Sequence, residues 1–109
     1  MAHVVDTRTS LLIASGVIAA ASLPLIFRVV GPNTLYGFRT ALTLSRPEVW
    51  YPANAFAGWA LLIASATSAL VLWRAPEPLL SEAWVPVAVF LVPLILALVA
   101  CFLYLRRFD

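Results

Sequence analysis

Three long, nearly uncharged apolar stretches constrain the fold of this chain more than any other feature. They cover residues 11–27, 53–73 and 84–105, and each is followed at once by arginine. A helix needs about 20 mostly apolar residues to cross the hydrocarbon core of a bilayer. With 63% hydrophobic and 11% charged residues, the chain has more apolar surface than one small soluble core can bury. We therefore predict an all-α membrane protein in which residues 1–109 form a single three-span domain.

A long polar loop, residues 31–54, separates the first two spans. It concentrates Asn, Tyr, Trp, Arg and Thr in a chain otherwise dominated by Ala, Leu and Val. Ser45 and Glu48 have the spacing of a capping box, with Pro47 in the first turn, so a short interfacial helix should begin there. Pro52 should kink or break this helix just before the second span.

Residue spacing in the second span predicts how the helices pack. Trp50, Asn54 and Gly58 are four residues apart, so a continuous helix would place them on one face. Small residues also recur along one stripe of this span, at Ala57, Ala60, Ala64 and Ser68.

The first span contains a matching pair of small residues, Gly16 and Ala20. Small residues let helix backbones approach closely, so we expect the first two spans to pack tightly, with the third against their flank. Three helices make a thin bundle, which favours a homo-oligomer or a larger membrane complex.

The arginines predict the orientation of the chain. Five of the seven basic residues flank the long loop or the C-terminus: Arg28, Arg39, Arg46, Arg106 and Arg107. The positive-inside rule then places the loop and the C-terminus in the cytoplasm and the N-terminus outside. Arginines at span ends serve topology and lipid headgroups, so no nucleic-acid partner is expected.

Arg39 is the most informative single residue of the loop, because its neighbours are largely apolar. A guanidinium there can bind a lipid phosphate, a carboxylate or free helix carbonyls. In a structural interpretation, Arg39 pairs with Glu48 or caps a helix. In a functional interpretation, Arg39 joins Asn33, Tyr36 and Asn54 in a polar pocket for an anionic group or a peptide.

The sequence offers little for catalysis. Glu48 is the only carboxylate of the loop, Cys101 is the single cysteine, and His3 is the single histidine, near the N-terminus. These residues provide neither a nucleophile–base pair nor a metal-ligand cluster. We therefore expect no enzymatic activity, no metal and no cofactor. No acidic or basic residue lies within a span, so an ion relay is not supported either.

The loop and the start of the second span resemble the signature of the SdpI-like family of small bacterial membrane proteins. The pattern runs Pro-Asn, Tyr-Gly-x-Arg-Thr, then Trp and Asn-x-x-x-Gly entering the next helix. The residues that carry it here are Pro32, Asn33, Tyr36, Gly37, Arg39, Thr40, Thr43, Trp50, Asn54 and Gly58. The family is named for immunity to a secreted sporulation-delay toxin, and members can also signal the toxin by recruiting a repressor to the membrane.

This resemblance implies an immunity or signalling protein of the bacterial inner membrane. It would bind a toxic peptide or a protein partner through residues 31–58. The candidate binding residues are Asn33, Tyr36, Arg39, Thr40, Trp50 and Asn54. Tyr36 and Trp50 can equally be interfacial anchors. The alternative function is a small accessory subunit of a larger membrane complex, with the small-residue stripes as docking surfaces.

Overall fold

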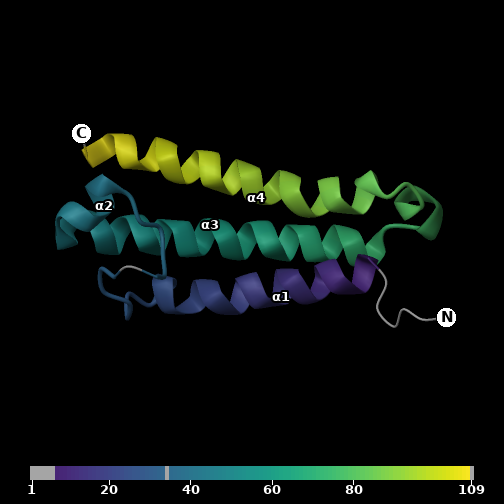
Figure 1. The fold of residues 1–109 in the computed structure, drawn as a ribbon, viewed down its shortest axis with the longest axis horizontal. Coiled ribbons are helices and arrows are strands. Elements are labelled where there is room, and N and C mark those ends of the chain that lie inside the picture. Colours follow the sequence, from purple (N-terminus) through teal and green to yellow (C-terminus); the bar gives the residue numbers. More distant parts are fainter. Residues whose placement is uncertain (1–6, 34, 109) are drawn as a thin grey trace.

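Three long helices form the protein in a computed structural model, which describes residues 7–33 and 35–108. Their axes run side by side in an elongated bundle of 51 × 24 × 19 Å (Figure 1). All three are long and apolar enough to cross a membrane, as the sequence predicts. The elements are α1 (Thr7–Ile26), α2 (Ala41–Ser45), α3 (Pro47–Arg74), the 3-10 turn η1 (Glu77–Leu80), α4 (Trp84–Leu105) and the 3-10 turn η2 (Arg106–Phe108).

Helix α3 is the centre of the bundle, with α1 on one side and α4 on the other (Figure 1). At Gly58 the backbones of α1 and α3 nearly touch, because a Cβ added there would lie 2.8 Å from the carbonyl oxygen of Ser22. This confirms the tight packing expected of the first two spans. Helix α4 packs mainly on α3, where the Ser68 hydroxyl donates to the carbonyl of Phe90 at 3.0 Å.

The small residues predicted to pack in α1 do not take part in its contact with α3. Gly16 and Ala20 are exposed, and no atom would lie within 4 Å of a Cβ added at Gly16. The buried α1 side chains are instead Ser15, Ser22 and Leu25. The helix is therefore rotated so that the predicted small-residue pair faces outward.

The expected capping box lies one helix earlier than predicted. Thr40 caps α2: its hydroxyl accepts from the Thr43 amide at 3.1 Å, and the Thr43 hydroxyl accepts from the Thr40 amide at 2.7 Å. The prediction that Ser45 caps the next helix is wrong. Ser45 ends α2 and donates to the carbonyl of Leu42, while Arg46 precedes α3 without a side-chain cap.

Pro52 does not break α3, which runs without interruption from Pro47 to Arg74. The missing amide of Pro52 would have bonded to the carbonyl of residue 48, in the first turn. Glu48 is exposed, so solvent can satisfy that carbonyl. The predicted interfacial helix and the second span are consequently one helix.

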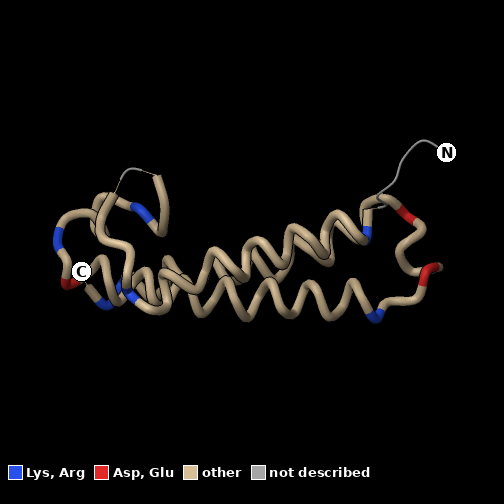
Figure 2. The backbone as a smooth tube through the Cα atoms, turned by 90° about the horizontal axis from the view of Figure 1, so that it is seen from below, with Lys and Arg blue, Asp and Glu red and all other residues tan. Residues whose placement is uncertain are grey.

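The two ends of the bundle differ in charge (Figure 2). The loop and the C-terminal end of α4 share one end, where most of the blue arginine positions gather (Figure 2). By their place in the chain these are Arg28, Arg39, Arg46, Arg106 and Arg107. At the other end, Arg8 at the start of α1 forms a salt bridge of 3.3 Å with Glu77 in η1. The arrangement gives one strongly basic end and one mixed end.

Candidate functional site

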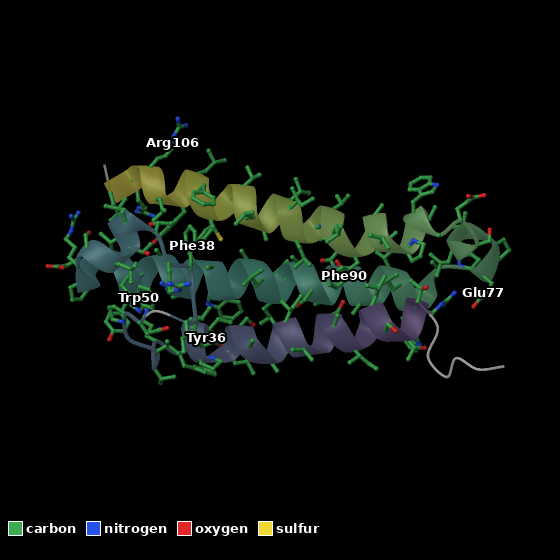
Figure 3. The ribbon with its side chains drawn as sticks, in the orientation of Figure 1. Tyr36, Phe38, Trp50, Glu77, Phe90 and Arg106 are labelled. Carbon is green, nitrogen blue, oxygen red and sulfur yellow. The ribbon has the colours of Figure 1, made fainter. Side chains whose placement is uncertain are left out.

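The segment Tyr36–Phe38, here called the strap, connects all three spans at the basic end (Figure 3). The Tyr36 hydroxyl donates to the carbonyl of Ala21 in α1. The Phe38 ring packs edge-on against Phe102 of α4, with ring centroids 5.2 Å apart. The backbone of Phe38 is bound by Asn54 of α3. Three residues of loop thus have a fixed position relative to every membrane helix.

Asn54 holds the strap through its side-chain amide. Its Oδ1 accepts from the Phe38 amide at 2.5 Å, and its Nδ2 donates to the Phe38 carbonyl at 3.2 Å and to the Trp50 carbonyl at 3.0 Å. The Asn54 side chain is buried. A buried amide with these partners is satisfied and rigid, so Asn54 has a structural part in the fold of the loop.

Gly37 and Trp50 fit together beneath the strap. Gly37 has φ +109°, and a Cβ there would lie 2.7 Å from Asn54 Oδ1 and 3.2 Å from the Trp50 ring. The fully buried Trp50 donates its indole N–H to the carbonyl of Val30 at 2.7 Å. Trp50 therefore supports the strap from below and fixes the chain that leaves α1.

Asn33 organises the start of the loop. Its Oδ1 accepts from the amides of Leu35 and Tyr36 at 2.8 and 2.6 Å. Its Nδ2 donates to the carbonyls of Gly31 and Tyr36 at 2.8 and 2.9 Å. These contacts form a turn held by the Asn33 side chain. Both polar atoms of that side chain are therefore bound within the loop.

Thr40 and Thr43 organise the end of the loop. Besides closing the capping box, the buried Thr43 hydroxyl lies 3.0 Å from the Phe38 carbonyl, to which it can donate. The backbone of Phe38 thus has partners on both α2 and α3. The sequence places Thr43 in the family pattern, but we did not predict it as a site residue. The three-residue spacing of Thr40 and Thr43 is that of a capping box and could have indicated its role.

Arg39 differs from the other candidates. It is exposed, and it makes no hydrogen bond or ion pair with residues 7–33 or 35–108. The predicted pair with Glu48 is therefore absent from this part of the chain. The structure brings Tyr36, Trp50 and Asn54 together around the strap and leaves the guanidinium of Arg39 outside that cluster.

A cavity of about 470 Å³ lies beneath the strap, with walls from all three spans. Its lining includes Ala21, Ala57, Leu98 and Cys101, and the strap itself closes one side. The polar groups at its edge are engaged elsewhere: the Ser22 hydroxyl donates to the carbonyl of Ala19 at 2.7 Å. The cavity suits an apolar guest. Across the residues described, no three His, Cys, Asp or Glu side chains could hold a metal ion.

Comparison with known protein families identifies a family model that matches most of the chain. The family model described as the SdpI/YfhL protein family matches residues 29–105, which include the loop, α2, α3 and α4. No curated protein matches the chain, and no solved structure does.

Proposed function

The chain belongs to the SdpI/YfhL protein family, and we propose that it is an immunity or signalling protein of the bacterial inner membrane. In this proposal it binds a toxic peptide, or a protein partner that reports the peptide, at the basic end of the bundle. The proposal uses residues 31–58 as the recognition region. It assigns the contact itself to Arg39 and the exposed apolar side chains of that region, and the support of this surface to the buried side chains.

One observation carries this proposal: the loop is held rigidly while its most distinctive side chain has no internal role. Arg39 lies between Phe38, whose backbone is bound by Asn54 and Thr43, and Thr40, which caps α2; its own side chain is exposed. Leu35 and Leu44 are 89% and 43% exposed on the same loop. A guanidinium on a fixed stretch of backbone, in a loop that also exposes apolar side chains, is a favourable contact for a peptide carboxylate, because little backbone entropy is lost on binding.

Charge at this end supports a cytoplasmic location for the loop. The five arginines there are opposed by a single acidic side chain among the described residues, Glu48. A partner at this end would then be a cytoplasmic protein, or a peptide that has entered the membrane.

A survival assay tests the proposal. Wild type, Arg39→Ala and Arg46→Ala would be expressed in a toxin-sensitive strain, with membrane levels measured by immunoblot. Arg46 is a matched control, since it is another exposed arginine of the loop. We expect protection by wild type and Arg46→Ala and a loss with Arg39→Ala. If wild type does not change survival, immunity to that toxin is excluded.

A second candidate, an accessory subunit of a larger membrane complex, is favoured by the outward face of α1. Gly16 and Ala20 are exposed and unused by the bundle, and small residues of this spacing suit close contact with another helix. Gentle solubilisation followed by mass spectrometry tests it. A stoichiometric, larger partner that is lost with Gly16→Leu would favour this function over the first.

A further inference from the structure

We propose that the cavity beneath the strap is a lipid site: it holds one acyl chain of an anionic phospholipid whose phosphate is bound by Arg39. This goes beyond the proposed function, which concerns peptide or protein recognition by the loop; at Arg39 the lipid phosphate and a peptide carboxylate would compete for one guanidinium. The inference rests on the chemistry of the cavity lining, on the opening of the cavity between two membrane helices, and on the unpaired charge of Arg39, which directly follows a residue of the lining.

The cavity lining selects an apolar guest. Its volume of about 470 Å³ lies in the range of roughly 300–1,000 Å³ that is usual for small-molecule sites. The Tyr36 hydroxyl is bonded to the Ala21 carbonyl, and the Ser22 hydroxyl to the Ala19 carbonyl. Both hydroxyls of the lining have used their donor hydrogen, and the remaining polar group, the Cys101 thiol, is only weakly polar, so a hydrocarbon chain is the matching occupant.

The position of the cavity gives it access to lipid. It is lined by α1 and α4, which make few direct contacts with each other. Ala21 on α1 and Leu98 on α4 both line the cavity and are nevertheless exposed. The space therefore opens sideways between these helices, into the part of the bilayer where acyl chains are the solvent.

The charge at the same end of the bundle as the cavity selects the headgroup. Arg39 directly follows Phe38, which lines the cavity, and its guanidinium has no partner among the described residues. Arg28 follows α1 at the same end and is also exposed. Guanidinium groups bind phosphate through paired N–H donors, so a negatively charged phospholipid is favoured over a zwitterionic one.

This site would differ from ordinary contact with the bilayer. An acyl chain that moves from the bilayer into the cavity gains little from the hydrophobic effect. The lipid tails that it leaves are as apolar as the leucines that line the cavity. Binding must therefore come from filling the void beneath the strap and from the arginine–phosphate attraction. Both contributions can be removed separately by substitution.

Native mass spectrometry on the purified full-length protein tests the cavity. The probes are phosphatidylglycerol and phosphatidylcholine with identical acyl chains, added to the detergent-solubilised protein. We expect wild type to retain one phosphatidylglycerol. Ala21→Phe, which puts a ring into the cavity, should reduce that occupancy several-fold. Ala20→Phe is the matched control, because Ala20 is the exposed neighbour that does not line the cavity. Equal retention by the two variants would overturn the proposal.

The headgroup is tested with Arg39→Gln and Arg46→Gln. Loss of one arginine near an anionic headgroup should weaken the preference for phosphatidylglycerol over phosphatidylcholine about five-fold. Arg46→Gln should keep that preference. An unchanged preference in Arg39→Gln would refute the assigned phosphate contact. The assay contains neither toxin nor protein partner, so its failure would leave the proposed function standing, and a failed survival assay would leave the lipid site standing.

Discussion

Asn54 binds both backbone polar groups of Phe38, a residue sixteen positions earlier in the chain. The Asn54 side chain accepts from the Phe38 backbone N–H and donates to the Phe38 backbone carbonyl. It thus satisfies the two backbone groups that a neighbouring strand would satisfy in a β-sheet. The contact closes the loop onto α3 and fixes the strap above the cavity. Much of the family pattern in this chain is explained by this closure.

Removing the amide of Asn54 should destabilise the fold. Asn54→Ala leaves the Phe38 amide without a partner and the Phe38 carbonyl with only Thr43. Since a buried group left unsatisfied costs about 1–3 kcal/mol, we expect a loss of roughly 2–4 kcal/mol in unfolding free energy. Ser65→Ala is the control, because buried Ser65 bonds only to its own helix at Leu62. Unfolding in detergent with increasing denaturant measures both, and similar losses would contradict the clamp.

Two glycines should respond oppositely to the same substitution. Gly37→Ala adds a Cβ at φ +109°, 2.7 Å from Asn54 Oδ1. The strained backbone alone costs about 1–3 kcal/mol, so the melting temperature should fall and the loop should become sensitive to protease. Gly16→Ala adds its Cβ in open space within a helix, where alanine is favoured by roughly 0.5–1 kcal/mol. A stable Gly37→Ala variant with an intact loop would show that the strap conformation is wrong.

Gly58 should set the separation of α1 and α3. A Cβ at Gly58 would lie 2.8 Å from the Ser22 carbonyl oxygen and 2.8 Å from the Ile26 side chain. The two helices must then move apart, and overpacking of this kind costs about 1–3 kcal/mol. Thermal unfolding of Gly58→Ala in detergent should show this loss. An unchanged melting temperature would mean that the helices do not touch at this point.

Arg8 should stabilise the opposite end of the bundle through backbone carbonyls more than through its ion pair. Its guanidinium donates to the carbonyls of Trp73 and Ala75 at 3.2 and 2.9 Å, at the C-terminal end of α3. A cation there contributes roughly 0.3–2 kcal/mol, and Arg8→Gln should lose about that amount. Glu77→Gln should change stability by less than about 1 kcal/mol, because the carboxylate side chain is 84% exposed. A larger loss in Glu77→Gln than in Arg8→Gln would reverse this ranking.

The spans were predictable because their signal is cumulative. Each is a run of apolar residues long enough to cross a bilayer, and single exceptions such as Pro52 do not outweigh the rest. The Trp50–Asn54–Gly58 face was also predictable, since it needs only a continuous helix. Trp50 and Asn54 are buried and Gly58 closely approaches α1, which agrees with the prediction that the three share one face.

The loop was less predictable because its contacts join segments far apart in sequence. Ser45 and Thr40 both precede suitable capping partners, and only the position of α2 decides between them. Likewise, Arg39 and Glu48 have opposite charge, but the fold leaves both exposed. The cavity depends on how α1, α4 and the strap sit around α3, which no local pattern contains.

Hydrogen–deuterium exchange at the Phe38 amide tests the central claim most directly. If Asn54 holds the strap, this amide should exchange slowly in wild type and much faster in Asn54→Ala, while amides in the middle of α3 keep their protection. Rapid exchange of Phe38 in wild type, or equal protection in both proteins, would contradict the claim that the family pattern acts by fixing the strap.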